Sequence, residues 1–150
     1  MPGLEDLYRE IILDHYHTPR NRGELPPPAS VARGHNPLCG DEITVYVAID
    51  GDTVSDVKVG GQGCSISQSS ASMMTEALTG KSVAEAEKLA GDFRGMMAGE
   101  TEPDEDEFGD LIALKGVVKY PIRIKCAVLA WDVLQEALGG AGRAAGAGAH

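Results

Sequence analysis

The spacing of hydrophobic residues changes near position 43, and this change limits the folds that the chain can adopt. Between residues 4 and 12 apolar side chains recur at helical spacing, which predicts an amphipathic helix that ends at His17. Along residues 43–49 they occupy every second position, which is typical of a half-buried strand. The turn residues 50–52 and the valines of residues 54–59 extend this pattern to a β-hairpin. The chain is therefore expected to combine helices with an antiparallel pair of strands.

Three further helix starts are predicted by the residues that open them. Ser65 is followed three residues later by Gln68, and Ser82 is followed three residues later by Glu85, which is the spacing of a capping box. Pro121 is expected to open the last helix, because proline suits the first helical position.

Other segments lack such a pattern. Residues 20–33 contain a triple proline and are expected to form an extended connector. Residues 100–110 hold seven acidic residues in eleven and are expected to form a solvated loop. Residues 139–150 are mostly glycine and alanine, so we expect a flexible tail after a single domain that spans residues 1–138.

Charge and cysteine content limit the class of protein. The formal net charge of -10 disfavours binding to nucleic acid and to anionic membranes, and favours a partner with a basic patch. The first residues do not resemble an export signal, and no apolar run approaches the roughly 20 residues that span a bilayer, so the protein is expected in the cytoplasm. The three cysteines are therefore expected as free thiols or as metal ligands, and not as a disulfide framework.

Two of the cysteines stand in positions that favour a functional role. Cys39 and Asp41 flank Gly40, and in an extended chain this spacing points both side chains to the same side, where they can share one cation. The alternative is an aspartate in an ordinary turn beside a free cysteine. Cys64 lies at a predicted helix start, where the helix dipole favours a thiolate; the alternative is a small residue that fills the core.

The other candidate ligands are weaker on local pattern alone. Cys126 lies on the apolar face of its helix, where a lone cysteine is more often part of the core. His15 and His17 point in different directions on a helix. His35, in a predicted loop, is the better candidate among the histidines, although an ordinary solvated residue is the more common alternative. Asp41 is therefore the expected fourth ligand beside the three cysteines. Such a set suits tetrahedral zinc, and it equally suits an iron–sulfur cluster.

A series of short motifs runs along nearly the whole chain. They are LYRE at 7–10, DHY at 14–16, PRNRG at 19–23, NPLCGD at 36–41, GCSIS at 63–67 and RIKC at 123–126. Together they resemble the motifs of the U-type iron–sulfur cluster assembly proteins, a family with an IscU and a SufU branch. The resemblance implies an α+β fold, in which a small antiparallel sheet of about three strands packs against several helices and the site lies at one end.

Lys125 suggests which branch the chain is closer to. Scaffold-type members usually carry histidine immediately before the third cysteine, and a Leu-Pro-Pro-Val-Lys segment upstream of it. Here Lys125 precedes Cys126 and residues 119–123 read KYPIR. A protonated lysine cannot bind a metal. In both of these features the chain resembles the SufU branch and not the scaffold type. Lys125 could offset the negative charge of the site; the alternative is an ordinary lysine on a helix surface.

Resemblance to the SufU branch implies a zinc-dependent sulfurtransferase. It implies that Cys39 accepts persulfide sulfur from a cysteine desulfurase of the SufS type, and that Cys39, Asp41, Cys64 and Cys126 hold Zn²⁺. The sulfur would pass on to a downstream cluster scaffold. One alternative is a scaffold protein on which an iron–sulfur cluster is itself assembled. A second alternative is a zinc-stabilised interaction module without sulfur chemistry.

Overall fold

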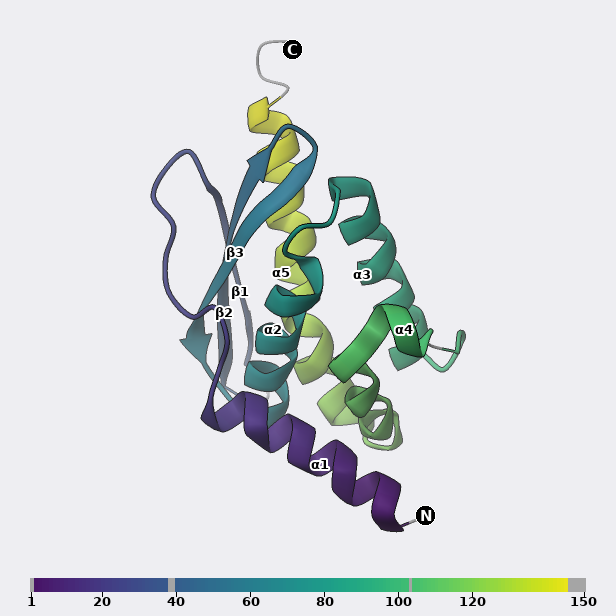
Figure 1. The fold of residues 1–150 in the computed structure, drawn as a ribbon. Coiled ribbons are helices and arrows are strands. Elements are labelled where there is room, and N and C mark those ends of the chain that lie inside the picture. The colour runs from purple at the N-terminus through teal and green to yellow at the C-terminus, as the bar shows by residue number, and fades with distance from the viewer. Residues whose placement is uncertain (1, 38–39, 103, 146–150) are drawn as a thin grey trace.

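The computed structural model describes residues 2–37, 40–102 and 104–145, and it describes only the backbone of residues 2–7, 105 and 140–145. Helices and strands follow one another along the chain as shown in Figure 1. They are α1 (Pro2–His17), β1 (Ser30–Asn36), β2 (Asp41–Asp50), β3 (Thr53–Gln62), α2 (Ser65–Leu78), α3 (Val83–Met97), α4 (Glu105–Phe108), the 3₁₀ helix η1 (Gly109–Lys119) and α5 (Pro121–Ala145).

The three strands form one antiparallel sheet in the order β1-β2-β3. Its inner face is apolar because every second residue of β2 is buried, as Ile43, Val45 and Val47 are. α5 packs on β1 and β2, and α2 lies beside it. Figure 1 shows that the helices gather on one side of the sheet. The α+β fold with a three-stranded sheet and the predicted hairpin are therefore confirmed.

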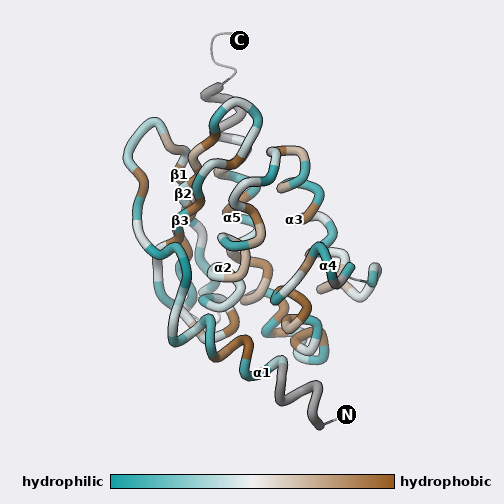
Figure 2. The backbone as a smooth tube through the Cα atoms, viewed as in Figure 1, coloured by the Kyte–Doolittle hydropathy of each residue, from teal (hydrophilic) through white to brown (hydrophobic). Residues whose placement is uncertain are grey.

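α5 forms the centre of the core and contacts β1, β2, α2, α3 and η1. Trp131 of this helix is fully buried, stacks on Phe93 of α3 with ring centroids 4.7 Å apart, and donates a hydrogen bond from Nε1 to Ser70 Oγ. Figure 2 shows hydrophobic residues along α5 inside the molecule and hydrophilic ones at the tip of the β2–β3 hairpin. A residue on the inner side of α5 is therefore held by contacts from several elements.

β1 replaces part of the predicted connector. Residues 30–33 pair with β2, so the extended connector expected over residues 20–33 is wrong there. Residues 20–29 do connect α1 to β1, but through bends and a turn. The strand was missed because its inward positions do not carry large apolar residues. A Cβ atom at Gly34 would lie 2.6 Å from Val133 Cγ2, so a side chain there would force Val133 of α5 to shift.

One of the two predicted capping boxes is present. Ser82 Oγ accepts from the Glu85 backbone N–H at 3.1 Å, and the Glu85 carboxylate accepts from the Ser82 N–H at 3.0 Å. The box predicted at Ser65 is wrong, because Cys64 is the N-cap residue of α2 and Ser65 is the first helical residue. Gln68 uses its side chain elsewhere, as an acceptor for Arg22.

The acidic segment contains more structure than the sequence predicted. A solvated loop was expected over residues 100–110, but residues 105–108 form α4 and η1 begins at Gly109. Phe108 supplies the physical reason, because its side chain is buried and fixes the segment on the core. The acidic side chains around it that the structure describes are largely exposed.

α5 begins at Pro121 as predicted, and its backbone is helical as far as Ala145. The flexible tail expected over residues 139–150 therefore overlaps the end of α5, and residues 146–150 lie outside the described part of the chain. Flexibility there, and a single domain over residues 1–138, stay predictions. None of the helices in the described ranges combines the length and the apolar character needed to cross a lipid bilayer.

Candidate metal centre

Three of the four predicted ligands meet at the lower end of the sheet in Figure 1. Asp41 is the first residue of β2, Cys64 caps α2, and Cys126 lies on α5. Their ligand atoms all lie within 4.8 Å of one another. Asp41 and Cys126 are fully buried, whereas Cys64 is partly exposed. Cys39, the fourth predicted ligand, lies outside the described residues.

The carboxylate of Asp41 is held by donors from the start of α2. Its Oδ1 accepts from the Cys64 backbone N–H at 2.8 Å and lies 3.1 Å from Ser67 Oγ. Its Oδ2 lies 3.9 Å from Cys64 Sγ. A buried carboxylate is costly unless hydrogen bonds or a cation compensate for the lost water. Oδ1 is satisfied by the protein, and Oδ2 is the oxygen that faces the thiol.

Cys64 stands at the N-terminus of α2 itself. Its backbone is extended, with φ -72° and ψ 169°, and its side chain makes no capping hydrogen bond. The positive end of a helix dipole favours negative charge at this position, either a thiolate or a carboxylate. The sequence placed Cys64 one residue before the cap, so the structure moves it closer to the dipole than predicted.

Cys126 was the least supported cysteine in the sequence, and the structure brings it to the other two. It lies on the inner side of the first turns of α5 and is fully buried. Asn36, the last residue of β1, lies with Nδ2 3.8 Å from Cys126 Sγ. Asn36 and Ser67 were not predicted as site residues, although both belong to motifs noted in the sequence. The contacts join residues far apart in the chain, so spacing alone could not reveal them.

The geometric reason given for Cys39 and Asp41 is not supported by the structure. That reason assumed an extended chain through Gly40, but Gly40 has φ +67°. This left-handed conformation favours glycine, and it means that the chain bends between the two residues. A cation bound by both side chains would depend on this bend at Gly40 and not on the alternation of an extended strand.

The donors present fit a zinc ion. Thiolate sulfur, with carboxylate oxygen as a further donor, is a common ligand set for Zn²⁺. Two sulfurs and one carboxylate already lie close together in a partly enclosed position, and Cys39 would complete a set of four.

A second group of metal-binding residue types occurs at His15, Glu76 and Asp110. His15 is fully buried, with Nδ1 2.8 Å from Ser72 Oγ and Nε2 3.0 Å from Asp110 Oδ2. Arg20 Nε lies 3.9 Å from Glu76 Oε1, and its positive charge disfavours a cation beside it. This group therefore forms a hydrogen-bonded network that joins α1, α2 and η1.

Arg20 also pairs with the end of α1. Its Nη2 donates to Asp14 Oδ2 at 2.6 Å. This hydrogen bond and the guanidinium charge hold the pKa of Asp14 below its usual value, and the same contact raises the pKa of Arg20. The candidate ligands His17 and His35 have exposed side chains, and His35 lies in β1 and not in the predicted loop. Lys125, considered as a charge partner of the site, is also exposed.

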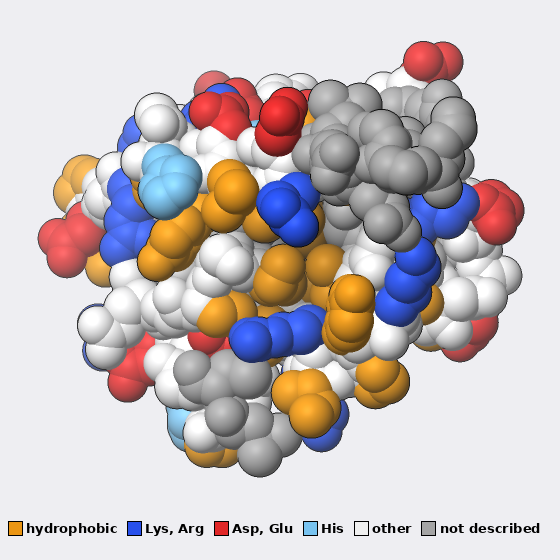
Figure 3. Space-filling model, turned by 90° about the horizontal axis from the view of Figure 1, so that it is seen from below, with side chains coloured by type: hydrophobic (Ala, Val, Ile, Leu, Met, Phe, Trp, Pro, Cys, Tyr) orange, Lys and Arg blue, Asp and Glu red, His pale blue; other side chains and the backbone are white. Residues whose placement is uncertain are grey.

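A groove of about 460 Å³ lies beside the site, between α1, η1 and the starts of α2 and α5. We call it the basic groove. It is lined by Tyr8, Arg9, Ile12, Leu13, Ser65, Ile66, Ala113, Gly116, Val117, Lys119, Tyr120 and Arg123. None of these described lining residues is acidic, and Ser65 directly follows Cys64. Figure 3 shows hydrophobic and basic side chains across the middle of this face, with most acidic ones toward its edge.

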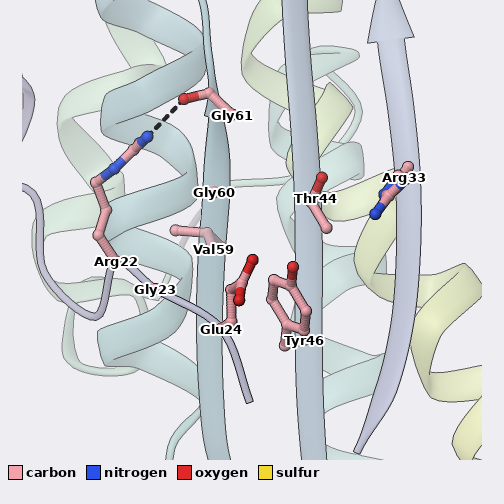
Figure 4. Close-up of a pocket in the computed structure, with 9 residues that line it drawn as sticks. All are labelled: Arg22, Gly23, Glu24, Arg33, Thr44, Tyr46, Val59, Gly60 and Gly61. Carbon is pink, nitrogen blue, oxygen red and sulfur yellow. Dashed lines mark hydrogen bonds between the residues drawn. The ribbon is translucent and has the colours of Figure 1, made fainter. Parts of the chain in front are cut away.

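Another hollow lies on the outer face of the sheet (Figure 4). Arg22, Glu24 and Arg33 stand around it, and Thr44 and Tyr46 contribute hydroxyl groups. None of the described residues that line it is a cysteine or a histidine. It therefore differs in chemistry from the thiol site at the end of the sheet.

The chain is similar to known proteins over most of its length. The sequence model of the family described as "NifU-like N terminal domain" matches residues 7–127. The zinc-dependent sulfurtransferase SufU of Bacillus subtilis (strain 168) is 47% identical over 134 residues, which cover 89% of this chain and 90% of that protein. The iron–sulfur cluster assembly scaffold protein IscU of Streptococcus pyogenes serotype M1 is 43% identical over 135 residues, which cover 90% of this chain and 84% of that protein.

Solved structures show the same fold. A putative iron–sulfur cluster assembly scaffold protein for the SUF system, from Fervidobacterium islandicum AW-1, superposes with a TM-score of 0.81 at 40% identity, covering 86% of this chain and 94% of that one. The N-terminal part of a nitrogen-fixing NifU-like protein from Brucella abortus superposes with a TM-score of 0.81 at 25% identity, covering 89% of this chain and 93% of that one. The likeness thus extends over nearly the whole of each chain.

Proposed function

Because the chain belongs to the NifU-like N-terminal domain family, we propose that it is a zinc-dependent sulfurtransferase that accepts persulfide sulfur from a cysteine desulfurase during iron–sulfur cluster assembly. One observation carries this proposal. Asp41, Cys64 and Cys126 come from three separate elements and place their ligand atoms within 4.8 Å of one another. A relative 47% identical to this chain is named as a zinc-dependent sulfurtransferase, which supports it.

In this proposal Asp41, Cys64 and Cys126 hold Zn²⁺ together with Cys39. When bound, zinc keeps the cysteine sulfurs in their thiolate form and protects them from oxidation. Burial of Asp41 and Cys126 keeps water away from half of the set, while partly exposed Cys64 leaves one side open toward a partner.

The sulfur acceptor in this proposal is Cys39. Its thiolate attacks the outer sulfur of a persulfide on the desulfurase cysteine. A new S–S bond forms on Cys39, the old S–S bond breaks, and the desulfurase cysteine leaves as a thiolate. The step moves one sulfur atom without net oxidation or reduction, and the persulfide on Cys39 is then passed to a downstream cluster scaffold.

The basic groove supports a protein partner at this end of the molecule. The chain carries a net charge of -10, yet Arg9, Lys119 and Arg123 line a groove that begins next to Cys64 and has no acidic residue among its described lining. A desulfurase of the SufS type would dock here with acidic and apolar side chains around its persulfide cysteine.

A scaffold that assembles a cluster is the second candidate, because a relative named as an IscU scaffold is 43% identical to this chain. Lys125 counts against it, since an ammonium group cannot act as a further ligand before Cys126. The two functions differ in the metal that they require.

Metal analysis with a desulfurase assay on wild type and Cys39→Ala tests the proposal. We expect colourless protein with about one zinc ion per chain, and faster desulfurase turnover that is lost in Cys39→Ala. Equal stimulation by Cys39→Ala would contradict the proposal. Visible absorption after anaerobic purification would favour the scaffold. Chelation that melts the protein, with no stimulation by the zinc-loaded form, would favour a zinc-stabilised interaction module.

A further inference from the structure

The two carboxylate oxygens of Asp41 have different surroundings. Oδ1 accepts from the backbone N–H of Cys64 at 2.8 Å and lies 3.1 Å from Ser67 Oγ. Oδ2 lies 3.9 Å from Cys64 Sγ. Asp41 and Ser67 are both fully buried, so water does not compete for these contacts. The protein therefore holds one oxygen and leaves the other facing the thiol.

Gly63 makes room for this arrangement. A Cβ atom at position 63 would contact Asp41 Oδ1 and would lie 2.6 Å from Ser67 Oγ. The backbone of Gly63 is not in the left-handed region, so its conformation does not itself require glycine. What the position requires is the absence of a side chain beside the carboxylate.

A chain of side chains leads from the segment before β1 to Ser67. Arg22 Nη2 donates to the Gly61 carbonyl at 2.5 Å, and its Nη1 donates to Gln68 Oε1 at 2.9 Å. With its oxygen held in this way, the Gln68 amide turns its NH₂ group toward Ser67 Oγ, 3.5 Å away. Gln68 thus supplies a donor to Ser67 Oγ and leaves the hydroxyl proton of Ser67 for an acceptor. Asp41 Oδ1 and the Cys64 carbonyl oxygen both lie 3.1 Å away, and a carboxylate oxygen is the stronger acceptor of the two.

We propose that Ser67 is a positioning residue for Asp41. Together with the Cys64 N–H it clamps Oδ1, so that Oδ2 is the oxygen offered to the metal, and Gly63 leaves the space that the clamp occupies. The inference rests on the zinc site of the proposed function. It also gives a role to Arg22, a residue of the PRNRG motif, as the group that orients Gln68.

Loss of the clamp has a measurable consequence. Hydrogen bonds from outside the ligand set fix the orientation of a ligand, and their removal typically lowers metal affinity by about tenfold to a hundredfold. Without the Ser67 hydroxyl, Oδ1 keeps only the backbone donor and the carboxylate can rotate. We therefore expect weaker zinc binding and a changed coordination geometry in Ser67→Ala.

Ser69 provides a matched control on the same helix. It is also fully buried, and its Oγ donates to the backbone carbonyl of Ile12 at 2.7 Å. Ser67→Ala and Ser69→Ala each remove one buried hydroxyl, but only the first removes a donor to Asp41. Zinc affinity is measured by chelator competition, coordination geometry by the visible bands of cobalt-substituted protein, and stability by unfolding of the metal-free form.

For Ser67→Ala we expect about tenfold weaker zinc binding and altered cobalt bands. Ser69→Ala should keep both at wild-type values, although each variant lowers the stability of the metal-free form. Gly63→Ala tests the same clamp without removing a hydroxyl. Its control is Gly60→Ala, where an added Cβ meets no atom within 4 Å of those described.

If Ser67→Ala and Gly63→Ala bind zinc as tightly as the wild type and show the same cobalt bands, this inference is overturned, while the proposed function still stands. Equal losses in Ser67→Ala and Ser69→Ala would also overturn it, because they would show a purely structural effect. If the wild type binds neither zinc nor cobalt, the zinc site of the proposed function is wrong and the inference falls with it.

Discussion

At the scale of single residues, the burial of Asp41 is the feature that needs a physical reason. A fully buried carboxylate loses the stabilisation that water gives it, and its two hydrogen-bond donors satisfy only Oδ1. Oδ2 lies 3.9 Å from the sulfur of the Cys64 thiol, a weak donor that gives little compensation. A cation bound at Oδ2 would supply the missing stabilisation.

Asp41→Asn tests this reasoning through metal removal. The amide keeps the shape of the carboxylate but lacks its charge, so we expect the variant to bind zinc at least about tenfold more weakly. Chelation should lower the melting temperature of the wild type by more than that of Asp41→Asn, because the wild type loses a bound cation beside a buried charge. Thermal unfolding followed by the fluorescence of buried Trp131 measures both shifts. Equal shifts in the two proteins would show that Asp41 does not hold the metal.

The candidate ligands could be predicted from the sequence, but the residues that orient them could not. Cys64 and Asp41 were recognisable from their residue types and from the motifs around them. Ser67 belongs to one of the same motifs, yet its role depends on a contact with a carboxylate 26 positions away. The contact of Asn36 with Cys126 spans 90 positions. Such pairs form only when β1, β2, α2 and α5 meet at the end of the sheet.

At the scale of elements, the two serines predicted as helix caps differ in a testable way. Ser82 begins α3 with both hydrogen bonds of a capping box. Ser65 is already inside α2, and the N-cap position there belongs to Cys64, which makes no side-chain capping bond. The start of α2 thus lacks the usual side-chain cap, and the backbone N–H of its N-cap residue, Cys64, donates to the Asp41 carboxylate.

Ser82→Ala should lower the free energy of unfolding by about 1 kcal/mol, because the first turn of α3 loses its capping acceptor. Ser65→Ala is the matched control and should change it by much less, since alanine suits a position inside the helix. Urea unfolding of the metal-free proteins measures both values. A larger loss in Ser65→Ala than in Ser82→Ala would contradict the assignment of the caps.

The elements predicted correctly were those with a regular pattern of large apolar residues, as in β2 and α5. β1 lacks that pattern because Gly34 faces α5 and Arg33 faces outward, so neither resembles a core position. α4 was hidden by acidic residues around one buried aromatic side chain, Phe108. In both segments long-range packing decides the structure, and local composition gives no sign of it.

At the scale of the whole molecule, the distribution of charge matters more than its sum. An excess of ten negative charges would by itself favour a basic partner surface, as the sequence suggested. Next to the thiol site the basic groove favours an acidic partner surface instead, because its charged lining residues in the described structure are all basic. The exposed side chains of Tyr120 and Leu13 at the same face add apolar surface that a partner can cover.

Arg9→Glu tests whether the desulfurase docks in this groove. Arg9 is exposed and lines the groove, and a reversed charge should repel acidic side chains of the partner. An exposed ion pair contributes up to about 1 kcal/mol, which corresponds to roughly a fivefold weaker complex at low salt. The effect should shrink as salt is added, because screening weakens charges at an interface edge. Calorimetric titration of the desulfurase at low and high ionic strength measures both changes.

Arg33→Glu separates docking in the groove from a general effect of charge. Arg33 is also exposed, but it lies on the outer face of the sheet, in the hollow of Figure 4. Both substitutions lower the net charge equally, so an effect of total charge would weaken binding alike in the two variants. If Arg33→Glu alone weakens the complex, the desulfurase docks on the sheet and not beside Cys64. Weakening by Arg9→Glu alone, with sulfur transfer preserved at saturating partner, would support docking of the desulfurase beside the proposed zinc site.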